Sequence, residues 1–179
     1  MDSQNCKSKL IMITGGQRSG KSIFAENLAL SMSDRPVYLA TAQVFDDEMK
    51  RRVEIHKQRR KERWINLESN LFISENKFTP TDVVLIDCLT LLATNWFFER
   101  NESKLEAFEE IKNQIDNVIA SGATFIMVTN EIGLGGVSPN KMQRDFTDLQ
   151  GKLNQYISGI ADEVFFIVSG IPVKIKPCQ

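Results

Sequence analysis

The segment that most constrains the fold of this 179-residue chain runs over residues 15–22 and reads GGQRSGKS. It has the spacing of a P-loop, in which a glycine is followed by four residues and then by Gly-Lys-Ser. An apolar run over residues 10–14 precedes it and predicts a buried strand, and residues 23–32 have helical spacing. A strand, a glycine-rich turn and a helix in this order form an anion site, because backbone N–H groups and the helix N-terminus face the same point.

This motif predicts a nucleoside triphosphate site. The expected nucleotide-binding residues are Gly15, Gly16, Gln17, Arg18, Ser19, Gly20, Lys21 and Ser22, with Asp87 and Glu131 from outside the loop. We expect Lys21 to reach the β- and γ-phosphates and Ser22 to bind Mg²⁺. Asp87 ends an apolar run, which fits the acidic residue that organises the metal from a neighbouring strand. A helix cap or a turn is the alternative role for Asp87, and both roles are compatible.

Apolar runs alternate with helical segments along the rest of the chain. Strands are expected over residues 10–14, 36–41, 83–88, 124–129, 164–168 and 171–175, and helices over 23–32, 46–63, 103–120 and 141–160. Pro172 lacks a backbone N–H, so the last strand is expected at an edge of the sheet or at a bend. Apolar strands that alternate with helices predict an α/β fold of the P-loop NTPase kind, with a mostly parallel sheet and helices on both faces. We expect a single domain over residues 1–179, with a flexible leader at residues 1–8.

Charge and cysteine content exclude several classes of protein. The chain has 22 Lys and Arg against 23 Asp and Glu, and its net charge of −1 provides no basic field for nucleic acid. Its single histidine excludes a metal centre with several histidines. Three cysteines without a Cys-x-x-Cys pair fit a reducing cytoplasm better than a disulfide framework. No apolar run approaches the roughly 20 residues of a membrane span, so we expect a cytoplasmic protein without one.

Basic residues are concentrated between residues 50 and 63, where eight Lys or Arg stand against two Glu. A solvated helical face is the usual meaning of such a run. Arg52, His56 and Arg60, however, follow one another at four-residue steps and would form one stripe of a helix. Arginines beside an imidazole make an anion site, and the imidazole is a possible nucleophile towards phosphorus. These three residues are therefore candidate catalytic groups, together with Lys21.

The stretch after the strand at residues 124–129 is a second candidate region. Ligands of a parallel sheet bind at the carboxyl ends of its strands, so we expect Glu131 to border the nucleotide or the acceptor. A turn without chemistry is the alternative for this stretch. Asn140-Lys141 begins like the Asn-Lys-x-Asp guanine reader of regulatory GTPases, but no Asp follows and a helix is expected to start there. A switch GTPase is therefore discounted.

Several further segments match one family in order along the chain. They are Thr14–Ser22, Tyr38–Gln43, Asp46–Met49 with Arg52, His56, Arg60 and Trp64, Asp87–Thr90 with Asn95, Thr129–Gly135, then Arg144, Phe146, Asp148, Gly151, Asn154, Gln155, Ala161, Asp162 and Gly170–Lys174. With this set the chain resembles the bifunctional adenosylcobinamide kinase/adenosylcobinamide-phosphate guanylyltransferase of cobalamin biosynthesis, from about Leu10 to Lys176. Many families share a P-loop, so the ordered set, with a histidine after Asp-Glu-Met, carries the resemblance.

The resemblance implies two reactions that use ATP or GTP. In the first, a nucleoside triphosphate phosphorylates the aminopropanol hydroxyl of adenosylcobinamide. In the second, GTP donates GMP to an enzyme histidine with release of pyrophosphate, and the GMP then passes to adenosylcobinamide phosphate, giving adenosylcobinamide-GDP. The guanylylated histidine of the family maps onto His56. The resemblance also implies a homotrimer whose partners are small-molecule substrates.

The chain departs from the family pattern at Lys61, at Thr147 and in the loop that contains Gly136, Ser138 and Pro139. These departures concern loop geometry and acceptor contacts rather than the nucleotide chemistry. Two other functions stay open. One is a P-loop kinase of another small hydroxyl-bearing acceptor, with the basic helix as an arginine lid and no nucleotidyl transfer. The other is a GTP-binding regulatory module without transfer chemistry.

Overall fold

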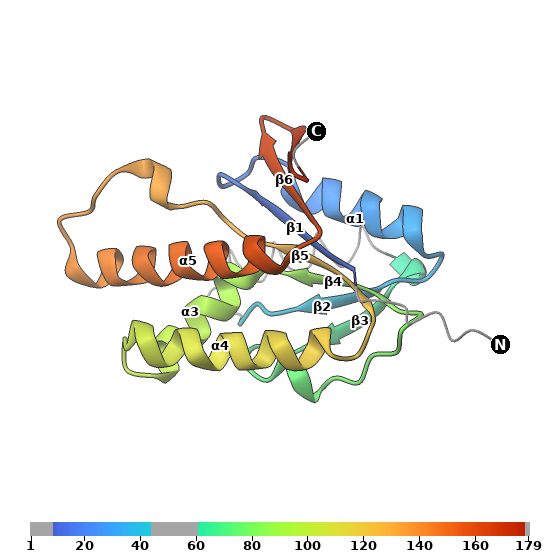
Figure 1. The fold of residues 1–179 in the computed structure, drawn as a ribbon, viewed down its shortest axis with the longest axis horizontal. Helices are drawn as coiled ribbons and strands as arrows, with labels where there is room; N and C mark the ends of the chain where they lie inside the picture. Colours follow the sequence, from blue (N-terminus) through green and yellow to red (C-terminus); the bar gives the residue numbers. More distant parts are fainter. Residues whose placement is uncertain (1–8, 44–60, 178–179) are drawn as a thin grey trace.

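The computed structural model describes residues 9–43 and 61–177 (Figure 1). The strands are β1 (Leu10–Gly15), β2 (Val37–Ala40), β3 (Ile65–Glu68), β4 (Val83–Asp87), β5 (Thr124–Val128), β6 (Glu163–Val168) and β7 (Ile171–Lys176). The α-helices are α1 (Lys21–Met32), α3 (Leu89–Glu99), α4 (Lys104–Ile119) and α5 (Lys141–Ile160), and the 3-10 helices are η1 (Lys61–Arg63), η2 (Ile73–Glu75) and η3 (Gly133–Gly135).

The seven strands form one sheet in the order β3-β2-β4-β5-β1-β6-β7. All neighbouring pairs from β3 to β6 are parallel, and β7 pairs with β6 in the antiparallel direction. Pro172 lies in β7 at the edge of the sheet, which confirms the edge position that its missing N–H predicts. The carboxyl ends of the six parallel strands therefore meet along one edge, where open α/β sheets bind their ligands.

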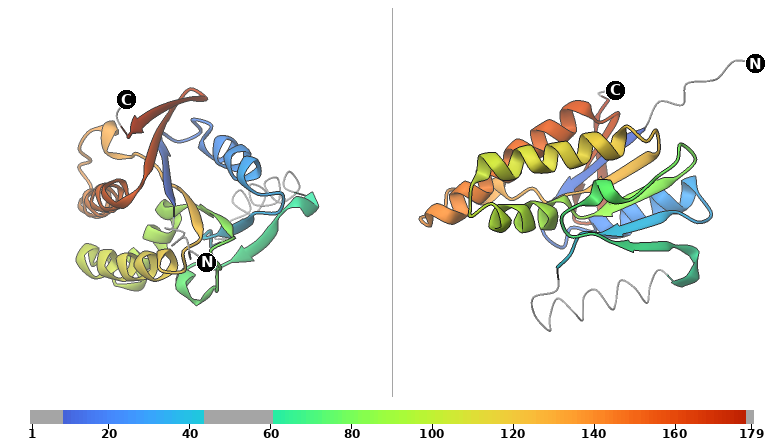
Figure 2. Two further views of the ribbon diagram at one scale, coloured as in Figure 1. Left: turned by 45° about the vertical axis from the view of Figure 1, so that its right-hand side comes forward. Right: turned by 90° about the horizontal axis from the view of Figure 1, so that it is seen from below.

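Helices cover both faces of the sheet (Figures 1 and 2). Successive residues of a strand point to opposite faces, so β1 contributes to both layers of the core. Ile11 and Ile13 pack on the face that α1 covers, together with Ala25. Leu10 and Met12 pack on the opposite face, in the cluster that includes the buried side chains of α3, α4 and α5. This layered arrangement confirms the predicted α/β class with a mostly parallel sheet.

The two longest helices match the expected ranges closely, because each has an apolar stripe and a capping residue. The side chain of Ser103 accepts a hydrogen bond from the N–H of Glu106 at the start of α4. The side chain of Asn140 accepts one from the N–H of Gln143 at the start of α5. The Asn-Lys pair at this point is therefore a helix start, which agrees with discounting a switch GTPase.

The sequence does not predict α3 or β3. In α3 seven of eleven residues are buried, which spreads apolar positions around much of the helix and removes the narrow stripe that helical periodicity detects. β3 is a four-residue edge strand whose side chains are mostly exposed, so it has no apolar run either. The structure of both elements is therefore decided by tertiary packing and not by the local spacing of apolar residues.

The expected helix over residues 46–63 lies outside the described residues except for its last turn, where residues 61–63 form η1. Arg52, His56 and Arg60 lie outside them too, as does the expected leader at residues 1–8. Of the helices in residues 9–43 and 61–177, none is long and apolar enough to cross a bilayer.

Candidate active site

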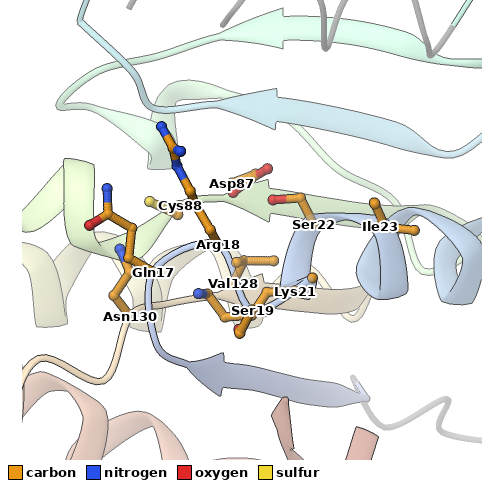
Figure 3. Close-up of a pocket in the computed structure, with 11 residues that line it drawn as sticks. Gln17, Arg18, Ser19, Lys21, Ser22, Ile23, Asp87, Cys88, Val128 and Asn130 are labelled. Carbon is orange, nitrogen blue, oxygen red and sulfur yellow. The ribbon is translucent and has the colours of Figure 1, made fainter. Parts of the chain in front are cut away.

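A cavity of about 490 Å³ opens at the carboxyl edge of the sheet, between the P-loop and the end of β4. The residues that line it are Gln17, Arg18, Ser19, Gly20, Lys21, Ser22, Ile23, Asp87, Cys88, Val128 and Asn130 (Figure 3). Six of the predicted loop residues thus share one space with Asp87. Gly15 and Gly16 are not among the lining residues, and their carbonyl groups hold Lys21 instead.

Two glycines allow the chain to make the tight turn of the P-loop. Gly20 is the N-cap of α1 and has a φ of 100°, a conformation that other residues rarely adopt. A Cβ atom on Gly15 would lie 2.5 Å from the carbonyl oxygen of Ile167 in β6. A side chain at residue 15 would therefore separate β1 from β6, and the sheet would lose the strand contact that supports the loop.

The turn between β6 and β7 supports the P-loop from the other end of the chain. The N–H of Gly170 donates to the carbonyl of Ser19 at 2.8 Å. Ser19 Oγ and Thr14 Oγ1 are buried and have no hydrogen-bond partner within the described residues. Buried hydroxyl groups nearly always have a partner, so two such oxygens beside the loop fit a site that a ligand completes.

Lys21 lies at the base of the loop and is 7% exposed. Its Nζ donates to the carbonyl oxygens of Gly15 at 3.1 Å and Gly16 at 2.6 Å. Burial lowers the pKa of Lys21 below its usual value, while the charge of the nearby Asp87 acts in the opposite direction. An ammonium group that is held only by neutral carbonyls is well placed to neutralise the charge of a phosphate.

The Asp87 carboxylate and the Ser22 hydroxyl face each other across the cavity (Figure 3). The hydroxyl of Tyr38 in β2 donates to Asp87 Oδ2 at 2.8 Å, which orients the carboxylate.

Asp87 ends β4, which is not adjacent to β1, the strand that leads into the P-loop. The strand β5 lies between the two. The expectation of a directly neighbouring strand was therefore wrong, since uniformly apolar strands do not encode their order in a sheet. Val128, at the end of β5, lines the cavity between the two strands.

Ser22 and Asp87 offer hydroxyl and carboxylate oxygens, which are the ligands that Mg²⁺ prefers. Within residues 9–43 and 61–177, no group of three or more His, Cys, Asp and Glu side chains could hold a metal ion by itself. Mg²⁺ in nucleotide sites usually takes one or two protein oxygens and completes its shell with phosphates and water. The two residues present fit a metal that arrives with a nucleotide.

Cys88 lines the cavity beyond Asp87, and the side chain of Thr41 holds its backbone in place. The Thr41 hydroxyl donates to the carbonyl of Cys88 at 2.7 Å and accepts from its N–H at 2.9 Å. Burial and, to a smaller extent, the Asp87 charge raise the pKa of the Cys88 thiol to about 12. The thiol therefore stays protonated at neutral pH, and Cys88 is a packing residue and not a nucleophile.

A buried polar network holds the chain that follows β5. Asn154 in α5 donates to the carbonyl of Asn130 at 3.1 Å. Its Oδ1 accepts from the Thr129 hydroxyl at 2.8 Å and from Gln150 Nε2 at 2.9 Å. The N–H of Asn130 donates to the Thr90 hydroxyl at 2.9 Å. Both sides of Asn130 are thus fixed, and α5 and α3 together place this residue at the cavity wall.

Glu131 lies behind the cavity and is not among its lining residues. Its N–H donates to the carbonyl of Gly15 at 3.0 Å, so its backbone supports the P-loop. Its Oε1 accepts from the N–H of Gly133 at 3.0 Å, and its Oε2 accepts from Asn154 at 3.5 Å. The preceding residue, Asn130, borders the cavity where Glu131 was expected.

Sequence reasoning assigned no individual role to Tyr38, Asn130 or Cys88. Asn130 follows the end of a predicted strand, and this position alone could have marked it as a ligand-facing residue. Tyr38 could not be found in this way, because its contact with Asp87 depends on the pairing of β2 with β4.

Comparisons with known proteins agree with the resemblance. The model of the family described as cobinamide kinase/cobinamide phosphate guanyltransferase, CobU, matches residues 11–175. The bifunctional adenosylcobalamin biosynthesis protein CobU of Escherichia coli (strain K12) is 39% identical over 181 residues, which cover 93% of this chain and 99% of that protein. CobU of Salmonella typhimurium (strain LT2) is 37% identical over 93% of this chain and 99% of its own length. CobP of Pseudomonas aeruginosa (strain PAO1) is 36% identical, with 92% and 96% covered.

Among solved structures, the KaiC-like protein PH0186 from Pyrococcus horikoshii OT3 matches with a TM-score of 0.47 and 16% identity, over 88% of this chain and 70% of that chain. The family assignment is based on the sequence matches instead. They cover almost the whole chain and almost the full length of the relatives. The chain therefore belongs to the CobU family of cobinamide kinase/cobinamide phosphate guanyltransferases.

Proposed function

We propose that this chain carries out both reactions of its family at the carboxyl edge of its sheet. The observation that carries the proposal is the single cavity in which the P-loop, the buried Lys21 and the Asp87 carboxylate meet. In the kinase reaction, the γ-phosphoryl group of ATP or GTP moves to the aminopropanol hydroxyl of adenosylcobinamide. In the transferase reaction, GTP donates GMP by way of His56 to adenosylcobinamide phosphate.

The P-loop binds the triphosphate in both reactions. Its backbone N–H groups and the N-terminus of α1 face the phosphates, and Lys21 moves its hydrogen bonds from the loop carbonyls to the β- and γ-phosphate oxygens. Arg18 lines the same cavity and adds a second positive charge. Charge that develops on the phosphorus is thereby offset by groups that are already in place.

Ser22 and Asp87 would hold Mg²⁺. The ion would supply positive charge that offsets the negative charge of the phosphates. Tyr38 keeps the Asp87 carboxylate turned towards Ser22 through its hydrogen bond to Oδ2. Of the two candidate bases for the acceptor hydroxyl, Asp87 and Glu131, only Asp87 lines the cavity.

His56 is the proposed nucleophile of the guanylyl transfer. Its imidazole nitrogen forms a bond to the α-phosphorus of GTP while pyrophosphate leaves, and the phosphate of the acceptor later displaces the histidine. A covalent intermediate divides one difficult displacement into two easier ones. Arg52 and Arg60, which share the helical stripe of His56 in the sequence, would offset charge on the transferred group. These three residues lie outside the described part of the chain, so their roles are argued from the sequence and the family.

Incubation with GTP that is labelled at the α-phosphorus tests the covalent step. The protein is expected to acquire label that is labile in acid and stable in base, as a phosphoramidate is, and His56→Ala should abolish it. Lys77→Ala, which removes an exposed lysine away from the cavity, is the matched control and should label normally. Labelling that survives in His56→Ala would exclude this nucleophile. Phosphorylation of the acceptor without any nucleotidyl-enzyme would favour a simple P-loop kinase, and GTP binding without turnover would favour a regulatory module.

A homotrimer and a cytoplasmic location complete the proposal, the first from the family resemblance and the second from cysteine usage. The measurement for the trimer is light scattering after gel filtration, which should give three times the 20.3 kDa of one chain. A monomer that is active in both reactions would contradict it.

A further inference from the structure

A second cavity, of about 430 Å³, lies at the carboxyl end of β2 and along α3. The described residues that line it are Gln43, Thr94, Asn95, Phe98 and Glu99. None of them belongs to the P-loop cavity or carries a positive charge. The cavity is therefore a separate space with its own chemistry.

Thr41 bonds to residues that line each of the two cavities. Its N–H donates to the carbonyl of Asp87 at 3.3 Å, and its hydroxyl bonds to both backbone groups of Cys88. Asp87 and Cys88 line the P-loop cavity. On the other side, the carbonyl of Thr41 accepts from Asn95 Nδ2 at 2.9 Å, and Asn95 lines the second cavity. The two cavities are neighbours along the same edge of the sheet.

The orientation of the Asn95 side chain is fixed, and the residue is 6% exposed. Its Nδ2 donates to the carbonyls of Thr41 at 2.9 Å and Asn70 at 2.7 Å, so both amide hydrogens are used. A flipped amide would place an oxygen against two carbonyls, which is unfavourable. Oδ1 is therefore directed away from them, and it is buried with no hydrogen-bond partner within residues 9–43 and 61–177. Such an oxygen lacks a donor.

Two other lining groups also act only as acceptors. The Thr94 hydroxyl uses its hydrogen on the carbonyl of Thr90 at 2.9 Å, so only its lone pairs are left. The Glu99 side chain is exposed, and a carboxylate offers only oxygens that accept hydrogen bonds. Phe98 is 54% exposed and offers an apolar ring beside them. Gln43 is the single lining side chain, among those described, that has N–H donors to offer.

We propose that this second cavity binds the acceptor substrate through its primary carboxamide groups. A carboxamide NH₂ brings two donors and no charge, so it satisfies acceptor oxygens without the cost of burying a cation. Cobinamide is a corrin whose edge carries such carboxamides, and its apolar ring face suits Phe98. This assignment rests on the proposed function. It places the acceptor in the cavity next to the triphosphate site, with Thr41 bonded to residues of both cavities.

Steady-state kinetics on the full-length protein test this site, with adenosylcobinamide and the nucleotide varied separately. Glu99→Gln and Phe98→Ala are each expected to raise the KM for adenosylcobinamide about tenfold, the first through one lost charge-assisted contact and the second through lost burial of apolar surface. The KM for the nucleotide should not change. Glu109→Gln and Leu105→Ala, two exposed positions of α4, are the matched controls and should resemble the wild type. Equilibrium dialysis with adenosylcobinamide alone should show the same weakening.

A corrin analogue whose carboxamides are hydrolysed to carboxylates tests the class of ligand. It should compete poorly with adenosylcobinamide in the wild type, because it brings negative charge towards Glu99 and loses the donors, and Glu99→Gln should recover part of its binding. An unchanged KM for adenosylcobinamide in both variants of an active enzyme would overturn the acceptor site and leave the proposed function intact. A wild-type protein that binds adenosylcobinamide without phosphorylating it would refute the function, and the dialysis of the variants would still decide the site.

Discussion

The two cavities at the carboxyl edge of the sheet differ in hydrogen-bonding character. The P-loop cavity contains Lys21, Arg18 and the N-terminus of α1, so it presents donors and positive charge. The second cavity contains Asn95 Oδ1, the lone pairs of Thr94 and the Glu99 carboxylate, so it presents acceptors. One edge of one sheet therefore holds an anion site and a site for neutral donors, and Thr41 bonds to residues of both.

The two cavities are also built differently. The first depends on backbone conformation, since Gly20 has a left-handed φ and Gly15 leaves no room for a Cβ. The second depends on Gln43 and on four side chains of α3, without special backbone geometry. Substitutions in the first should therefore be severe and should affect both reactions, whereas substitutions in the second should be graded and specific for the acceptor.

The largest effect is expected for Lys21→Ala. The variant loses the ammonium group that meets the phosphates, and we expect kcat/KM to fall by roughly 100-fold or more in both reactions, as for other groups that stabilise transition-state charge. The KM for adenosylcobinamide in any residual activity should not change. Lys77→Ala is the control. A variant that retains near-normal turnover would show that the P-loop cavity is not the site of transfer.

Tyr38→Phe should have a smaller and more selective effect. It removes the hydrogen bond to Asp87 Oδ2, and such a bond to a charged group is worth about 1.5–3 kcal/mol, so we expect activation by Mg²⁺ to weaken at least about tenfold. The measurement is a Mg²⁺ titration of the kinase rate. Tyr156→Phe removes the corresponding phenol contact to Asp116, away from both cavities, and should leave the titration unchanged. A change in the acceptor KM instead would mean that the wall between the cavities does not separate their functions.

The contrast between Lys21 and Tyr38 also shows what a sequence can reveal. The P-loop is contiguous, so its eight residues and the strand and helix around it can be read directly. Tyr38 and Asp87 are 49 residues apart and meet only because β2 pairs with β4. The sequence of an apolar strand does not show which strands it pairs with, and this also explains why the position of β5 between β1 and β4 was not foreseen.

The same limit applies to helices. α5 was predicted at its observed bounds, because its apolar stripe and the Asn140 cap are both local signals. α3 was not predicted, and it supplies four of the described residues of the second cavity. A helix whose buried residues are spread around most of its circumference has no narrow apolar stripe, so it resembles any apolar run in the sequence. The part of the site that the motif specifies was therefore predictable, and the part that the tertiary fold assembles was not.

Asn154→Ala tests whether the buried polar network supports the P-loop cavity, and its effect on nucleotide binding should be moderate. The carbonyl of Asn130, the Thr129 hydroxyl and Gln150 Nε2 would each lose one partner, and the bond between Gln150 and Thr129 would remain. We expect the free energy of unfolding to fall by about 1–3 kcal/mol in urea titrations, and the KM for the nucleotide to rise several-fold. The exposed Asn113 of α4 provides the matched control, Asn113→Ala. An equal rise in the acceptor KM would show that the network supports both cavities.

The smallest effect is expected for Cys88, which belongs to the wall between the cavities. Its thiol has a pKa raised to about 12 by burial and by Asp87, so almost no thiolate exists between pH 7 and 9. Iodoacetamide should therefore leave Cys88 unmodified in the folded protein at pH 8, and mass spectrometry should find it modified once urea unfolds the chain. The rate on the folded protein should stay low as the pH rises to 9, because the group loses its proton only near pH 12. Rapid modification at neutral pH would mean that the wall is open to solvent, and the two cavities would then have to be regarded as one continuous cleft.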